Sequence, residues 1–118
     1  MNAEAHYQKG QQLAATQAKL DPATDWEGII EGCYMAAHDY VLAGAEWLGQ
    51  AHQQSHEHQQ NPRLLTQAAA PKAVRDAWES LDILRAGNVY GGHTNGAASA
   101  EARLDMQTTV NWATGLRP

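Results

Sequence analysis

Three histidines lie in a polar run, AHQQSHEHQQN, at residues 51–61. His52 and His56 are spaced i, i+4, so on a helix they would share one face and could bind a transition metal. His58 follows two residues later, and His38 could add a ligand from the preceding helix. The alternative is a solvated connection rich in glutamine and histidine, since no second metal-ligand motif occurs elsewhere.

Arg85 lies on the apolar stripe of a predicted helix, and Asn88 falls on the same stripe. A lone buried charge is costly, so this arginine must pair with a carboxylate or reach a cleft. Asp39 and Glu46 are candidate acids, and the stem could instead extend the guanidinium to water. The other interpretation is an anion- or RNA-binding role for Arg85.

Several kinds of site are missing from the sequence. There is no phosphate-binding Gly-x-x-x-x-Gly-Lys loop, no dinucleotide-binding Gly-x-Gly-x-x-Gly and no Cys-x-x-Cys pair, so we expect no cofactor. The paired Glu-x-x-His motifs of a di-iron bundle are also absent. Cys33 lies within an apolar stripe and is interpreted as a small core residue.

The elements that must position these residues are helices. Apolar residues recur at helical spacing in every periodic segment, and Asp21-Pro22, Asn61-Pro62, Pro71 and the glycine-rich run 91–96 separate the segments. We expect Pro22 to begin the second helix. The predicted fold is all-α, an antiparallel up-and-down four-helix bundle with one additional short helix, in a single domain covering residues 1–118. The predicted helices are 3–20, 22–51, the short 63–70, 72–90 and 97–116.

The second helix is apolar on two sides, with one stripe centred near Cys33 and with Met35 and Leu42 opposite. Such a helix is either central in a bundle or buries its second side in another subunit. Ile83 and Tyr90 also project away from the core stripe of their helix. We therefore predict a homodimer whose interface contains Met35, Leu42, Ile83 and Tyr90.

The formal net charge of −5 makes a broad nucleic-acid surface improbable, because phosphate binding needs clustered basic residues. The eight lysines and arginines are scattered along the chain. No apolar stretch is long enough to span a membrane, and the N-terminus has no apolar leader. With a single cysteine, a cytoplasmic location is expected.

Three segments together resemble the HEPN family (higher eukaryotes and prokaryotes nucleotide-binding). Residues 84–90, LRAGNVY, look like its last-but-one helix, in which an arginine precedes a His or Tyr by five positions. Residues 33–38, CYMAAH, resemble its tyrosine-rich run, and Tyr7, Gly10 and Leu13 resemble its opening pattern.

The resemblance implies a dimeric helical bundle in which active members are ribonucleases, each subunit supplying an arginine and a histidine to a shared cleft. Arg85 matches that arginine, but Tyr90 stands where the histidine would be, and tyrosine is a poor base at neutral pH. His93 lies beyond two glycines. The candidate catalytic residues are thus Arg85, Tyr90 and His93.

We predict from this pattern a non-catalytic HEPN-like binding or interaction module with Arg85, Asn88 and His38 as candidate ligand-binding residues. The resemblance also implies an association with a nucleotidyltransferase, a toxin–antitoxin pair or a defence system. The alternatives are a metal-independent ribonuclease toxin that uses Arg85 with Tyr90 or His93, and a metal-binding bundle that uses His52, His56 and His58.

Overall fold

The computed structural model of the chain describes residues 2–50, 58–87 and 96–118, and within these ranges it is all-helical with no strand. The predicted all-α class is confirmed. The elements are α1 (Ala3–Ala18), α2 (Trp26–Trp47), the 3₁₀ turn η1 (His58–Gln60), α3 (Asn61–Gln67), α4 (Lys72–Arg85) and α5 (Gly96–Leu116).

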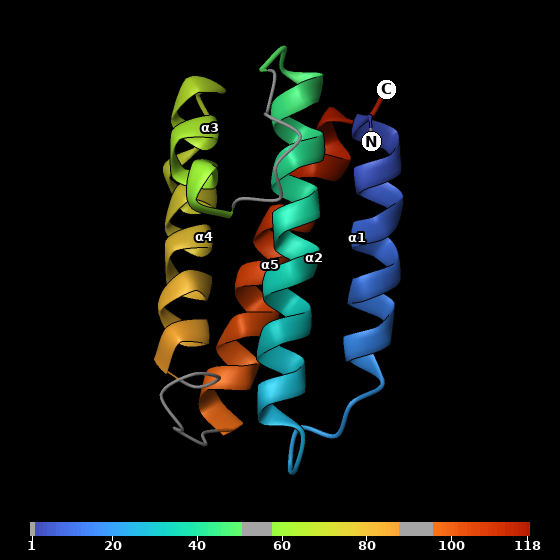
Figure 1. Cartoon of the computed structure of the whole chain (residues 1–118), viewed down its shortest axis with the longest axis vertical. Coiled ribbons are helices and arrows are strands. Elements are labelled where there is room, and N and C mark those ends of the chain that lie inside the picture. The colour runs from blue at the N-terminus through green and yellow to red at the C-terminus, as the bar shows by residue number, and fades with distance from the viewer. Residues whose placement is uncertain (1, 51–57, 88–95) are drawn as a thin grey trace.

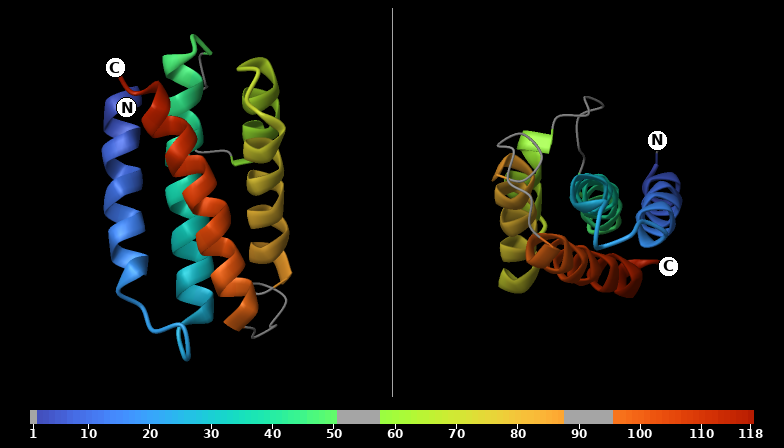
Figure 2. Two further views of the ribbon diagram at one scale, coloured as in Figure 1. Left: turned by 180° about the vertical axis from the view of Figure 1, so that it is seen from behind. Right: turned by 90° about the horizontal axis from the view of Figure 1, so that it is seen from below.

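Successive long helices run in alternating directions, and the N- and C-termini lie at the same end of the molecule (Figure 1). α2 packs against α1, α5, α4 and the short α3, so it is the central helix. α5 crosses α2 obliquely on the side opposite the view of Figure 1, and α4 lies beside α5 (Figure 2). In the described part of the chain, no helix is long and apolar enough to cross a membrane.

The turn between α1 and α2 differs from the expectation that Pro22 begins a helix. α2 begins at Trp26, because Asp21 and Asp25 form a hydrogen-bonded turn first. The Asp21 Oδ1 atom accepts from the Ala23 amide at 2.9 Å, and the Asp25 Oδ2 atom accepts from the Asp21 amide at 2.9 Å. Aspartate side chains commonly stabilise turns in this way, in competition with the helix.

The core surrounds α2, whose residues are buried on almost every side between Cys33 and Ala45. Cys33 is fully buried, as the sequence predicted, and burial raises the pKa of its thiol to about 12. The expectation that Leu42 contacts a second subunit is wrong, because this residue is buried within the chain. Leu42 is only 2% exposed because Leu64 of α3 and Ala68, the residue after α3, pack against it.

Tyrosine and tryptophan supply the aromatic bulk of this phenylalanine-free core. The Tyr7 ring contacts Tyr40 edge-on, with centroids 5.4 Å apart, and Trp47 at 5.6 Å. Its hydroxyl group lies 2.8 Å from the Thr114 hydroxyl on α5. A buried tyrosine needs such a partner for its polar tip, and here that partner joins α1 to α5.

Candidate functional site

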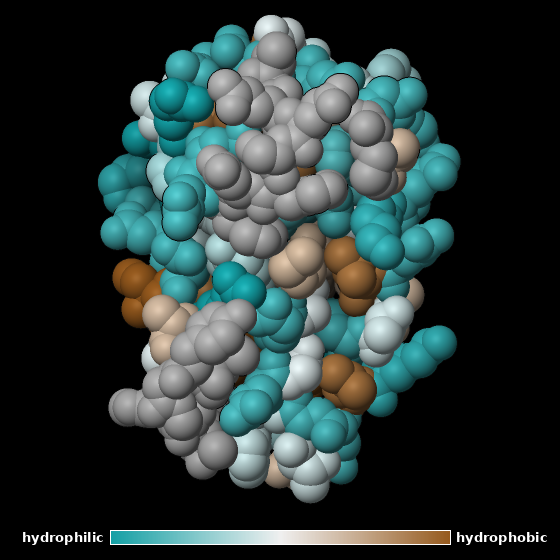
Figure 3. Space-filling view, viewed as in Figure 1, coloured by the Kyte–Doolittle hydropathy of each residue, from teal (hydrophilic) through white to brown (hydrophobic). Residues whose placement is uncertain are grey.

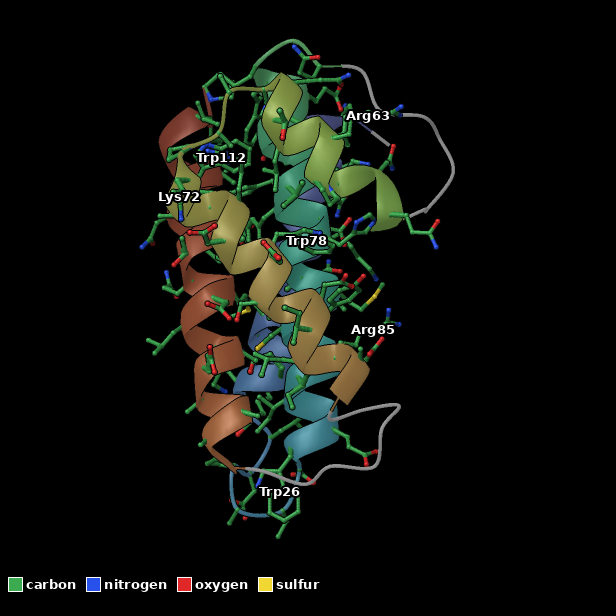
Figure 4. All side chains as sticks on the ribbon, turned by 90° about the vertical axis from the view of Figure 1, so that its left-hand side faces the viewer. Trp26, Arg63, Lys72, Trp78, Arg85 and Trp112 are labelled. Carbon is green, nitrogen blue, oxygen red and sulfur yellow. The ribbon has the colours of Figure 1, made fainter. Side chains whose placement is uncertain are left out.

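The charged, polar and aromatic side chains that could bind a ligand or take part in a reaction meet where α2 and α4 pack together. We call this region the α2–α4 seam. On α2 their spacing is i, i+3, i+7 and on α4 it is i, i+4, i+7, so each set occupies one helix face. Figure 4 shows Trp78 in the middle of α4 and Arg85 near its C-terminal end. The seam consists of Glu31, Tyr34 and His38 on α2, Trp78, Asp82 and Arg85 on α4, and Asn61 at the start of α3.

Arg85 is held by a carboxylate and an aromatic ring from α2. Its Nε atom donates to Glu31 Oε2 at 2.8 Å, and its Nη2 atom donates to Glu31 Oε1 at 3.1 Å. The guanidinium carbon lies 4.3 Å from the centroid of the Tyr34 ring. The side chains of Arg85 and Glu31 are 21% and 36% exposed. Arg85 is therefore paired with a carboxylate, as expected, but the acid is Glu31 and not Asp39 or Glu46.

Tyr34 connects the two ends of the seam. Its hydroxyl group donates to Asp82 Oδ1 at 3.4 Å, and its ring stacks on Trp78 with the centroids 4.8 Å apart. Burial raises the pKa of Tyr34 to about 12, and the negative charge of Asp82 contributes in the same direction while Arg85 opposes it. The phenol is thus protonated at neutral pH and serves as a hydrogen-bond donor rather than a base.

His38 lies at the other end of the seam and is buried. The Asn61 Nδ2 atom donates to His38 Nδ1 at 2.8 Å, and Asn61 is fully buried at the N-terminus of α3. The His38 ring lies 6.3 Å from the Trp78 ring, so the Tyr34–Trp78 stack separates His38 from Arg85. The structure thus brings two predicted ligand-binding residues into one seam, with His38 anchoring α3.

Several predicted site residues lie outside the described part of the chain. These are Asn88, Tyr90 and His93, which follow α4, and His52 and His56, which precede η1. His58 begins η1, but the description does not extend to its side chain. Within residues 2–50, 58–87 and 96–118, no group of three or more histidine, cysteine or acidic side chains could hold a metal ion.

The residues predicted for a dimer interface have different surroundings. Met35 is partly buried against the core, whereas Ile83 is 64% exposed on α4. Leu42 is covered by α3, and Tyr90 lies outside the described residues. Of these four residues, Met35 and Ile83 are therefore the two described ones that have surface available to another molecule.

A second buried polar pair joins α1 to α2. His6 Nδ1 lies 2.8 Å from Asp39 Oδ1, and both residues are buried. Asp39 therefore pairs with His6 and not with Arg85, the partner expected for it from the sequence. The sequence places Asp39 off the main apolar stripe of α2, which indicates that this acid needs a polar partner. It does not show that α1 covers this side of α2, because that depends on how the helices pack.

Comparison with known proteins identifies no relative, since no family model, no curated protein and no solved structure matches the chain. An inference about function must therefore be drawn from the sequence motifs and the geometry of the α2–α4 seam.

Proposed function

We propose that the chain is a non-catalytic HEPN-like binding module that acts as a homodimer in the cytoplasm. The three sequence segments that resemble the HEPN family support this assignment. The alternating directions of the long helices also support it, because they suit an antiparallel four-helix bundle with one short extra helix.

The pairing of Arg85 with Glu31 is the observation that supports a module without catalytic activity. A catalytic arginine must offer its charge to a phosphate, whereas the Nε and Nη2 atoms of Arg85 both donate to one carboxylate. A phosphate would have to displace that carboxylate and would meet its negative charge nearby. Asp82, which accepts from Tyr34, adds another acid to the seam. The seam thus suits stabilisation of the helix pair better than cleavage of RNA.

An RNA cleavage assay tests this proposal. Purified protein is incubated with total RNA in the presence of a metal chelator, alongside the Arg85→Ala variant. Arg75→Ala is the matched control, because Arg75 is an exposed arginine on the same helix. We expect no cleavage by any of the three proteins. Cleavage that is lost in Arg85→Ala and kept in Arg75→Ala would instead establish a ribonuclease that uses Arg85 with Tyr90 or His93.

The homodimer is proposed to form through the face of α2 that carries Met35. Figure 3 shows one face of the molecule, on which apolar groups form small patches among hydrophilic side chains. Light scattering at micromolar concentration tests the proposal with wild type and Met35→Glu. We expect a dimer that Met35→Glu converts to a monomer, and a dimer that persists in the control Leu104→Glu, which changes an exposed leucine on α5. A monomeric wild type would refute it.

The family resemblance also leads us to propose a protein partner, a nucleotidyltransferase or the second member of a toxin–antitoxin or defence pair. Co-expression of the chain with the product of the adjacent gene tests this. Co-purification of the two proteins supports the proposal, and failure to co-purify argues against it.

A further inference from the structure

A shallow groove runs between α4 and α5, on the face of α4 that turns away from the seam. Figure 2 shows these two helices side by side, and the groove has a volume of about 400 Å³. Carboxylates line it on both helices, and its two apolar side chains come from the C-terminal half of α4. Its lining consists of Asp76, Glu79, Ser80, Ile83 and Leu84 from α4 and Glu101 from α5. None of these residues belongs to the α2–α4 seam.

Ile83 is the most exposed apolar side chain that lines the groove. It is 64% exposed, and the only other large apolar side chains exposed to a comparable degree in the described residues are Leu48 and Leu104. Asp76 and Glu79 lie on the same side of α4, seven and four residues before Ile83. These positions span about 10 Å along the helix axis, which matches the i to i+7 contacts of a docked helix.

Only one of the three carboxylates in the groove forms an ion pair in the described part of the chain. Asp76 pairs with Lys72 at 2.6 Å, but in the described part of the chain no basic side chain forms an ion pair with Glu79 or Glu101. Glu101 accepts one hydrogen bond, from the Ser80 hydroxyl at 3.3 Å. The groove therefore presents an apolar strip with uncompensated negative charge on both of its helices.

Asp105 adds to this negative charge one turn further along α5. Burial raises the pKa of Asp105. Hydrogen bonding from the nearby Ser80 side chain lowers the pKa of Asp105, and the negative charge of Glu101 raises it. Its Oδ2 atom is buried with no hydrogen-bond partner in the described part of the chain. A positive group above Glu101 would lessen this repulsion between neighbouring carboxylates.

We propose that the α4–α5 groove binds a basic amphipathic helix of a partner protein. The apolar face of that helix would cover Ile83 and Leu84, and its lysines or arginines would pair with Glu79 and Glu101. A second copy of this chain is a poor occupant, because symmetric pairing of the groove would place these carboxylates against each other. The acidic rim also disfavours nucleic acid and anionic lipid. The proposal concerns a surface separate from the seam and does not depend on the function proposed there.

A peptide-binding assay tests the proposal. The probe is a fluorescein-labelled amphipathic peptide of leucine and lysine, and its anisotropy is measured against the full chain at a salt concentration of about 0.15 M. One control peptide has the same composition scrambled so that the leucines share no face. The other has glutamate in place of lysine. We expect saturable binding of the amphipathic basic peptide alone.

Two variants and two matched controls locate the binding. We expect Ile83→Asp, and separately the pair Glu79→Lys with Glu101→Lys, to weaken binding at least about tenfold, as for central interface residues. Leu48→Asp and Glu27→Lys change an exposed leucine and an exposed acid elsewhere and should alter binding by less than about twofold. Because all the substituted residues are exposed, circular dichroism should show unchanged helix content.

Three results would overturn the proposal. The first is no binding of the amphipathic basic peptide. The second is equal binding of the scrambled peptide, or wild-type binding by both Ile83→Asp and the charge-reversed pair. The third is a homodimer that Ile83→Asp dissociates, which would make a second copy the occupant. RNA cleavage tests the seam separately, so failure of one proposal is distinguishable from failure of the other.

Discussion

Replacing Arg85 with methionine removes the positive charge at one end of the α2–α4 seam and keeps a similar apolar stem. Replacing Glu31 with glutamine removes the opposite charge with little change of shape. The two substitutions, made singly and together, form a double-mutant cycle that isolates the Arg85–Glu31 interaction.

The structure sets the expected size of the effect. Exposed ion pairs contribute about 0.2–1 kcal/mol, and two hydrogen bonds between partly buried side chains place Arg85–Glu31 at about 1 kcal/mol. The stacking of the guanidinium on Tyr34 adds about 0.5–1 kcal/mol. Arg85→Met should therefore lower the free energy of unfolding by about 1.5–2 kcal/mol, which lowers Tm by roughly 6–8 °C. Glu31→Gln should cost about 1 kcal/mol, because the Tyr34 contact remains.

Urea denaturation followed by circular dichroism measures these energies. The matched control is the cycle Lys72→Met with Asp76→Asn, which removes an ion pair that is far more exposed. We expect a coupling energy of about 1 kcal/mol for Arg85–Glu31 and a clearly smaller one for Lys72–Asp76. Coupling no greater than that of the Lys72–Asp76 pair would refute a structural role for Arg85.

Two further predictions concern close packing and a buried acid. A methyl group at Gly32 would lie 2.7 Å from the Gln17 Cβ atom, so Gly32→Ala must displace α1 and should cost about 1–3 kcal/mol in thermal denaturation. Gly115→Ala, in open space on α5, should instead stabilise by about 0.5–1 kcal/mol, and equal effects at the two glycines would contradict this reasoning. Because the pKa of Asp105 is raised on folding, its contribution to stability is lost as pH rises above its ordinary value. The Tm of Asp105→Asn minus the Tm of wild type should therefore increase as the pH is raised from 4 to 7. A Tm difference that stays constant across that range would contradict the prediction.

The existence and type of the helices could be predicted from local signals. Asn61-Pro62 and Pro71 mark the starts of α3 and α4, where proline suits the first turn. The start of α2 was placed too early, because Asp21 and Asp25 stabilise a turn that competes with the first helical residues. Local propensity identifies an element more reliably than its boundary.

The candidate site was predicted only in part. Arg85 was recognised because a charge on an apolar stripe needs a partner. Glu31 was not, since it lies 54 residues away in sequence and many acids could have met Arg85. The pairing of His6 with Asp39 was missed for the same reason.

By itself, the sequence determined the all-α class, the burial of Cys33 and the need of Arg85 for a partner, because periodicity and charge are local properties of the chain. Tertiary structure decided which helix covers Leu42 and which acid binds Arg85. It also decided that Ile83 borders a groove with carboxylates on both sides. These contacts depend on how the helices are aligned along one another, and that alignment is set by packing over the whole core.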